Sequence, residues 1–255
     1  MQKLSLLAAG ASILAIALSS SVSAADLGQT NNTQIDVTHV SAVLNGTISN
    51  VTGNVDETAA AIGNSLSVTG GTAGVINNTQ LSAAGIASAL NTTVSNVKGD
   101  VTATSAAIGN SATIAVDTTG VVNNYQASLN VDPSATLNET VTYVTGAVNG
   151  TAAAIGNSLS ITGDTGRINT TQIATAPDTA ALNGNIQNVT GAVSETAAAI
   201  GNSLNVTGTY GTLNNYQVNA NRWNAASANV TVRNVTGAVS ATAASIANSA
   251  SITVK

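Results

Sequence analysis

Residues 58–68 read Thr-Ala-Ala-Ala-Ile-Gly-Asn-Ser-Leu-Ser-Val, and this segment returns with few changes from Thr104, Thr151, Thr196 and Thr242. Within the segment, Ile62, Asn64 and Leu66 alternate with small residues. A period of two is typical of a β-strand with one face turned inward, and it does not fit a helix. We therefore expect a strand wherever the segment recurs.

Two further blocks recur in the same order around this segment. A block that begins Leu44-Asn45-Gly46 returns from Leu90, Leu137, Leu182 and Ala228. A glutamine recurs at intervals of 46, 46, 46 and 45 residues, at Gln34, Gln80, Gln126, Gln172 and Gln217. A period between 20 and 50 residues indicates an array in which each repeat packs against its neighbours. We expect one domain over residues 25–255, with repeats near 30–75, 76–121, 122–167, 168–212 and 213–255.

The repeat predicts an all-β protein, a β-solenoid similar to a parallel β-helix. When repeats lie on one another about 4.8 Å apart, each side chain meets its counterpart in the next layer. Asparagine and glutamine suit this arrangement, because an amide donates to one neighbour and accepts from the other. We expect three structural ladders: the five glutamines; Asn64, Asn110, Asn157, Asn202 and Asn248; and the aliphatic series Ile62, Ile108, Ile155, Ile200 and Ile246.

The number of coils in each repeat follows less directly from the sequence. A single coil of 46 residues with three long sides would enclose more space than Ala, Val and Ile could fill at native packing density. We therefore expect two coils of about 23 residues per repeat, which makes a rod about 48 Å long at the usual layer spacing. The low content of charged residues fits a solenoid with either one or two coils per repeat, since like charges that stack directly repel each other.

The first residues predict export. Lys3 is followed by an uncharged apolar run over 4–18 and by small residues up to Ala24, as in a secretory signal peptide over residues 1–24. Only 7% of residues are charged and the formal net charge is −5. Clustered basic residues, which phosphate contacts require, are missing, so we expect no nucleic-acid partner.

The sequence offers little material for catalysis. One histidine and no cysteine cannot supply a Ser-His-Asp or Cys-His arrangement, so we expect no enzyme, no catalytic residue and no cofactor. Asp117 and Asp164 occupy the same place in two repeats, and stacked carboxylates could bind calcium. Because aspartate is also an ordinary turn residue, we expect no metal site and keep these two residues as weak candidates.

A few aromatic residues interrupt the repeat. Tyr125 and Tyr216 share one repeat position, and Arg222-Trp223 follows the second of them. Exposed aromatic and arginine side chains often anchor contacts with partners. We note these four residues as a candidate contact surface, although isolated exposed aromatics are common on proteins.

The segment Ala61-Ile62-Gly63-Asn64-Ser65, the absence of cysteine and the strands punctuated by Asn and Gln resemble the secreted bacterial surface-fibre proteins of the curlin type and the repeat-bearing holdfast-anchor proteins. The resemblance implies a subunit on the outer cell surface that forms an amyloid-like adhesive fibre or anchors cells during attachment and biofilm formation. It also implies stacking roles for the Gln34 and Asn64 series.

These observations lead to three functional hypotheses. The first is an exported adhesive protein that self-associates, with outer-membrane secretion or anchor proteins and extracellular polysaccharide as further partners. The second is a monomeric module whose flat Thr- and Asn-rich face binds polysaccharide. The third is a polysaccharide-cleaving β-helix enzyme, which the few carboxylates make the weakest of the three.

Overall fold

A computed structural model describes residues 11–129, 132–221 and 223–255. Twelve strands account for nearly all of these residues. Their bounds are β1 (Ala11–Asp36), β2 (Val40–Thr52), β3 (Val55–Ser82), β4 (Ile86–Lys98), β5 (Val101–Ser128), β6 (Ser134–Val144), β7 (Val148–Ala174), β8 (Thr179–Val189), β9 (Val193–Gly208), β10 (Tyr210–Asn219), β11 (Ala225–Val235) and β12 (Val239–Val254). No helix with the length and apolar character of a membrane span occurs among the described residues.

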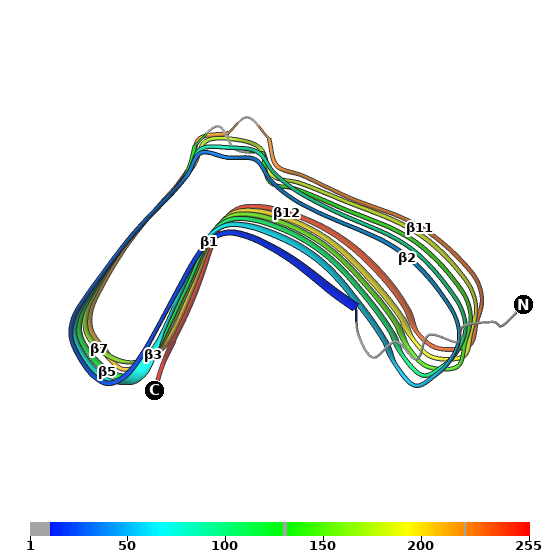
Figure 1. The fold of residues 1–255 in the computed structure, drawn as a ribbon, viewed down its shortest axis with the longest axis horizontal. Coiled ribbons are helices and arrows are strands. Elements are labelled where there is room, and N and C mark those ends of the chain that lie inside the picture. Colours follow the sequence, from blue (N-terminus) through cyan, green and yellow to red (C-terminus); the bar gives the residue numbers. More distant parts are fainter. Residues whose placement is uncertain (1–10, 130–131, 222) are drawn as a thin grey trace, which may run out of the picture.

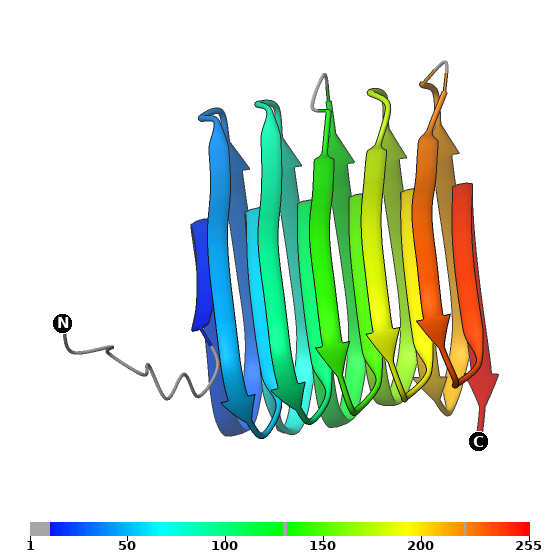
Figure 2. The ribbon, with the colours of Figure 1, turned by 90° about the vertical axis from the view of Figure 1, so that its right-hand side faces the viewer.

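The strands form two parallel sheets. Sheet A runs in the order β1-β3-β5-β7-β9-β12, with β10 also paired to β7, and sheet B runs β11-β8-β6-β4-β2. Each strand pairs with the strand one repeat away, so that Gln80 lies beside Gln126 and Asn64 beside Asn110. Figure 2 shows the strands stacked side by side from β1 at one end to β12 at the other. The chain is a β-solenoid, as the repeat predicts.

Each repeat makes one coil, so the prediction of two coils per repeat is wrong. Hydrogen-bonded neighbours such as Asn64 and Asn110 are 46 residues apart, which is the length of a whole repeat. An open coil with three long sides would need larger side chains to fill it. Figure 1 shows instead that the coil is flattened and bent into two arms, so that the space between facing strands is thin. Small and medium side chains can fill such a space at native density.

The two arms are built differently. In arm A the strands of sheet B face the first parts of the long strands, for example Ile86–Lys98 facing 101–108. In arm B each long strand turns back on itself, as 110–128 does in β5. The two arms meet at the bend that is visible at the centre of Figure 1.

Three apolar clusters fill the arms. Valines and isoleucines such as Val97 and Val101 fill the tip of arm A. Alanines and leucines such as Ala107 and Leu90 fill its middle, and residues such as Ile114 and Val122 fill arm B. Inward and outward residues alternate along most strands, which explains why the segment at 58–68 shows a period of two.

At the turn at the tip of arm A, four of the five repeats have an asparagine in a left-handed conformation. Asn50, Asn96, Asn188 and Asn234 have φ angles between 54° and 60°, in the left-handed region that asparagine tolerates better than most residues. Tyr143 takes the same position in the middle repeat, with φ of 58°. The preference for asparagine at this position is therefore explained by the backbone conformation as well as by stacking.

The predicted signal peptide overlaps the first strand. Residues 1–10 lie outside the described residues, while residues from Ala11 to Ala24 pair with β3 as the first part of β1, from Ala11 beside Glu57 to Ala24 beside Gly70. Cleavage after Ala24 would therefore remove about half of β1 and leave Asp26–Asp36 paired with the end of β3. The cleavage itself stays a prediction.

Candidate functional site

The first candidate feature is a buried asparagine ladder where arm B begins. Each of the first four side chains donates from Nδ2 to Oδ1 of its counterpart in the next coil at 2.7 Å. The ladder consists of Asn64, Asn110, Asn157, Asn202 and Asn248. Nδ2 also donates to a backbone carbonyl on the returning strand, for example from Asn110 to Ala127 at 2.9 Å. Both amide hydrogens are thereby used inside the protein, which removes the cost of burying them.

A glutamine ladder runs beside it with the opposite direction of donation. From Gln80 onward each Nε2 donates to Oε1 of the preceding coil at 2.7–2.9 Å, in the series Gln34, Gln80, Gln126, Gln172 and Gln217. The same Nε2 donates to a backbone carbonyl, as Gln126 does to Ser158 at 2.9 Å. The two ladders together hold neighbouring coils in a single register, because a slip of one residue would break both.

The isoleucine series lies outside the core. Ile62, Ile108, Ile155, Ile200 and Ile246 follow one another in register along sheet A. The first four are half-buried and Ile246 is 37% exposed. Ala61, the residue before Ile62, points into the apolar cluster of arm A, so Ile62 lies on the opposite face of the strand. The series forms an aliphatic line along the solenoid and contributes little to the interior.

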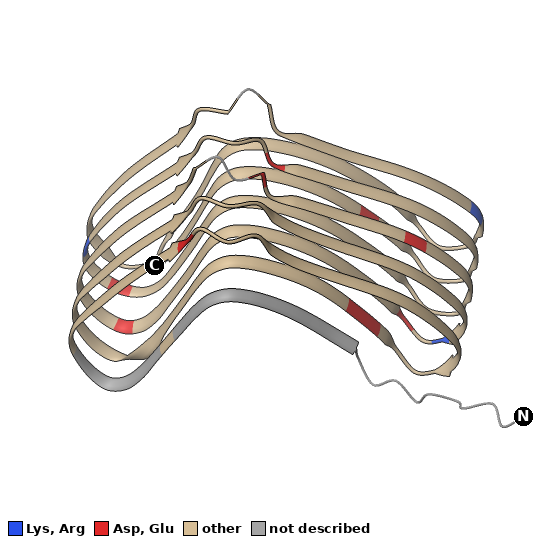
Figure 3. Cartoon of the chain, turned by 45° about the horizontal axis from the view of Figure 1, so that its top comes forward, with Lys and Arg blue, Asp and Glu red and all other residues tan. Residues whose placement is uncertain are grey.

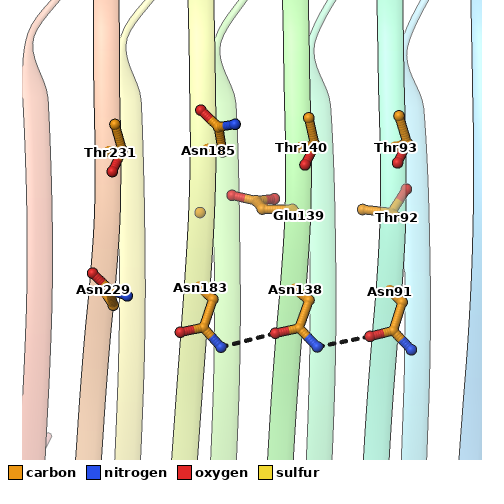
Figure 4. Close-up of a pocket in the computed structure, with 11 residues that line it drawn as sticks. Asn91, Thr92, Thr93, Asn138, Glu139, Thr140, Asn183, Asn185, Asn229 and Thr231 are labelled. Carbon is orange, nitrogen blue, oxygen red and sulfur yellow. Dashed lines mark hydrogen bonds between the residues drawn. The ribbon is translucent and has the colours of Figure 1, made fainter.

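The outer face of sheet B carries an exposed ladder of the same kind. Asn91, Asn138 and Asn183 each donate to the preceding asparagine at 2.7–2.8 Å, beginning at Asn45. Threonines stand in the next row, including Thr93 and Thr140. Figure 4 shows these rows lining a shallow depression of about 400 Å³. The depression presents regularly spaced amide and hydroxyl groups to solvent.

The outer side of arm B carries the aromatic candidates. Tyr125 is 40% exposed and Tyr216 is 62% exposed, and Thr171 lies between them in the intervening coil. Tyr216 lines a second shallow depression of about 410 Å³ together with Thr171 and Asn214. Trp223 is 66% exposed, and Arg222 lies outside the described residues.

The two aspartates proposed as a weak calcium site do not stack. Asp164 pairs with Thr118, because the register shifts between Ala115 and Thr118. Two residues there, Val116 and Asp117, lie opposite Gly163, whose φ of 123° marks the bulge. Asp164 Oδ1 accepts a hydrogen bond from the backbone N–H of Thr209 at 3.1 Å, which is an ordinary turn role. The register therefore does not place Asp117 directly beside Asp164, which is the arrangement that the weak candidate calcium site requires.

Sequence reasoning missed a group of buried carboxyl groups. Glu57, Glu139 and Glu195 are 1–3% exposed in the interior of arm A. They fit because glycines lie opposite them. A Cβ added at Gly150 would overlap the carboxyl group of Glu195 and lie 2.9 Å from Oε1 of Glu139. The carboxyl groups of Glu139 and Glu195 therefore converge over Gly150, in a space that a larger residue would close.

Burial of these groups changes their protonation. Thr92 donates to the carboxyl group of Glu57, whereas the carboxylate oxygens of Glu139 and Glu195 have no well-formed hydrogen bond among the described residues, and the backbone N–H of Gly150 lowers the pKa of Glu195 only in part. Burial, followed by the neighbouring Glu139, raises the pKa of Glu195 from 4.5 to about 10. Burial likewise raises the pKa of Glu139. A proton on one carboxyl group can then be donated to the other, which satisfies both.

A fourth buried acid lies near the bend. Asp178 is fully buried, and burial together with the charge of Asp132 raises its pKa from 3.8 to about 8. Strand alternation could have located part of this group: Leu137 points inward, so Glu139, two residues later, must do the same. Asp178 follows a variable loop, where no such alternation applies.

The geometry favours stacking and surface contact over chemistry. Glu139 borders the depression of sheet B, but it is only 3% exposed and Glu195 is only 1% exposed, so the pair is not presented together on the surface. In the described part of the chain, no group of three or more His, Cys, Asp or Glu is arranged to hold a metal ion. Figure 3 shows that the charged residues are few and scattered over the coils.

Comparison with known proteins identifies a family for the chain. No curated protein and no solved structure shows significant similarity to the chain. A family model described as holdfast attachment protein D matches residues 6–254, nearly the whole length. The description names an attachment role, which is structural rather than catalytic and belongs to the cell surface or envelope. The solenoid described above therefore belongs to the holdfast attachment protein D family.

Proposed function

We propose that the protein is an exported structural subunit of the holdfast anchor that self-associates through the ends of its solenoid. The observation that carries the proposal is the continuity of the amide ladders, which pass from coil to coil with the same geometry throughout. A ladder of this type has no built-in limit, because each coil offers the next one the same donors and acceptors.

The edges of the solenoid support this proposal. Strand β12 has a single neighbour, β9, in the described chain, and it contains no charged residue. Natural sheets usually protect exposed edges with charges, prolines or bulges. Ile252 and Val254 at this edge are 45% and 63% exposed. Burial of these side chains by another copy would favour association.

The test is assembly of the purified, processed protein. We expect fibres whose diffraction has a 4.7–4.8 Å repeat along the fibre axis, because the coils would continue through the assembly. The matched control is Ile252→Lys, in which the lysine stays in water in a single copy but would be buried by a second one. Fibres of the natural chain and their loss in this variant support the proposal, whereas a permanently monomeric natural chain contradicts it.

A second function is favoured by the depression in sheet B. Its rows of asparagine and threonine offer hydrogen-bond donors and acceptors at the spacing of the strands, which suits an extended polysaccharide. We expect saturable binding of such a polymer by the single copy, measured by calorimetry or on a glycan array. Replacement of Thr93 and Thr140 by valine should weaken binding without loss of fold, and unchanged binding would contradict this role.

A further inference from the structure

The Asn64 side of the solenoid contains an unsatisfied acceptor. Asn64 is fully buried and its Oδ1 receives no hydrogen bond from any described group. In the other coils this atom accepts from the preceding asparagine, as Asn110 does from Asn64. The residue that pairs with Asn64 in β1 is Leu18, and leucine has no amide group to donate. The predicted signal peptide therefore covers this edge without completing the ladder.

The opposite side of the solenoid contains the matching donor. Asn248 accepts from Asn202 at 2.7 Å, and its own Nδ2 donates to nothing in the described part of the chain. In the other coils Nδ2 has two acceptors: the next asparagine, and a carbonyl on the returning strand, which is Leu81 for Asn64 and Val218 for Asn202. Asn248 therefore lacks two partners that every other member of the ladder has.

A second copy supplies both missing partners. Ile35 in β1 pairs with Leu81 in β3. The carbonyl of Ile35 is therefore the equivalent, one coil earlier, of the Leu81 carbonyl that accepts from Asn64. If the last described coil of one copy lies on the first coil of another, Asn248 can donate to Oδ1 of Asn64 and to the carbonyl of Ile35. The junction then repeats the hydrogen bonds found between the coils of a single chain.

We propose that β12 of one copy takes the position on the β3 edge that the signal peptide holds before cleavage, with Asn248 donating to Asn64 of the second copy. This inference rests on the proposed self-association and adds its interface, its register and its dependence on processing. In this register Ile246 lies beside Ile62 and Ser249 beside Ser65, as their equivalents do throughout sheet A.

The charges and apolar groups at the two edges are compatible. The residue of β12 that would lie beside Glu57 is Ala241, so no like charges meet there. Val239, Ile246 and Ile252 are 37–51% exposed in the single copy and would be covered by the second. The first part of β1, which pairs with β3 from Glu57 to Gly70, holds the same edge, so association requires its removal.

The absence of cysteine allows a direct test by disulfide trapping. Ser65→Cys and Ser249→Cys in one chain place two thiols four strands apart, about 19 Å, which is too far for a bond within a copy. Across the proposed junction their Cα atoms would be about 4.8 Å apart, within the range of a disulfide. The control chain carries Ser65→Cys with Ser251→Cys, two residues out of register and about 8 Å away.

We expect oxidation to give a series of disulfide-linked multimers only for the pair at 65 and 249. The protein should be processed and exported, with its N-terminus checked by sequencing, and compared with the full chain that retains residues 1–24. Multimers formed equally by the control pair, or by the full chain, would overturn the inference. Fibres without the expected link contradict this interface alone, whereas the absence of any assembly contradicts the proposed function as well.

A second variant tests the amide itself. Asn248→Asp keeps the oxygen that accepts from Asn202 but removes the donor for the second copy, and it places a carboxylate against Oδ1 of Asn64. We expect the association constant to fall by about tenfold or more, while the single copy stays folded. Asn183→Asp, the same change on the exposed ladder, is the control and should have little effect. Equal effects of the two changes would show that Asn248 does not form the junction.

Discussion

Tyr143 occupies a backbone position that asparagine takes in four other repeats. Its φ of 58° lies in the left-handed region, and its side chain is 60% exposed, so contacts do little to offset the strain. A left-handed conformation costs most residues roughly 1–2 kcal/mol, and asparagine bears less of this cost. The residue type at this turn therefore affects stability through the backbone.

We expect Tyr143→Asn to stabilise the protein by about 0.5–1 kcal/mol, because asparagine tolerates this conformation. The new side chain would also stand between Asn96 and Asn188, which occupy the equivalent positions in the adjacent coils. Urea unfolding of both proteins measures the change. The reverse substitution, Asn188→Tyr, should destabilise by a similar amount, and a stabilising effect of that control would contradict the explanation.

The buried glutamates predict that the protein is most stable in acid. The folded state raises the pKa of Glu195 to about 10, whereas the unfolded chain titrates near 4.5. Between these values the folded state binds the proton more tightly, so the free energy of unfolding falls as pH rises through this window. Below about pH 4.5 both states are protonated and this contribution is fully present. Urea midpoints measured from pH 4 to pH 9 should therefore decrease steadily.

Glu195→Gln should flatten this pH dependence and raise the stability at pH 8 by about 1 kcal/mol or more, because an amide needs no proton to stay neutral. Glu57→Gln is the matched comparison, and it should change the profile less because Thr92 already donates to Glu57. A stability of the natural chain that rises from pH 5 to pH 8 would contradict this account of the buried pair.

At the scale of the strand, the buried and exposed asparagine ladders have the same geometry but different energetic roles. Asn157 is fully buried, donates to Asn202 and to the carbonyl of Ile173, and accepts from Asn110. Asn138 makes the same ladder bonds at the surface of sheet B, where water can replace them. The cost of losing a hydrogen bond depends mainly on whether the remaining partner stays buried.

Asn157→Ala should therefore destabilise the protein by about 2–4 kcal/mol, since a buried carbonyl and a buried amide oxygen lose their donors. Asn138→Ala should cost about 1 kcal/mol or less. Chemical denaturation of both variants gives the comparison. If the two changes cost the same, burial does not decide the strength of the ladder.

The repeat makes the strands and their register predictable from the amino-acid sequence alone. Gln34 to Gln217 keep nearly constant spacing, so parallel stacking of like residues is the arrangement that satisfies their amides. The number of coils per repeat is not predictable in this way, because no local sequence pattern indicates that the coil is flattened into two thin arms. The convergence of Glu139 with Glu195 escapes sequence reasoning because the two residues come from different blocks of different repeats and meet only across the interior.

At the scale of the whole molecule, a coil is the unit that can be added or removed. Deletion of residues 111–157 joins Asn110 to Ser158, which takes the place of Ser111 in the register. We expect this shorter chain to keep its β-sheet circular dichroism and to unfold cooperatively, with an m-value lower by about a fifth because less surface is buried. Both amide ladders would continue across the new joint.

Deletion of residues 111–133 is the matched control. This removes about half of a coil, so the returning strand of arm B is lost and the strands that follow meet the wrong neighbours. We expect that chain to be unfolded or aggregated. A folded product would mean that a half-coil is a structural unit, contrary to the pairing of residues a full repeat apart.

The long interval between paired residues also determines how the chain must fold. Every strand pairing in the two sheets joins residues one repeat apart, so the pairing of one coil with the next requires closure of a loop of about 46 residues. The first pair of coils is therefore the slow step, and each later coil adds to an edge that already exists. A chain of this kind can remain extended while it crosses a membrane, and it folds quickly once an ordered edge is there to receive it.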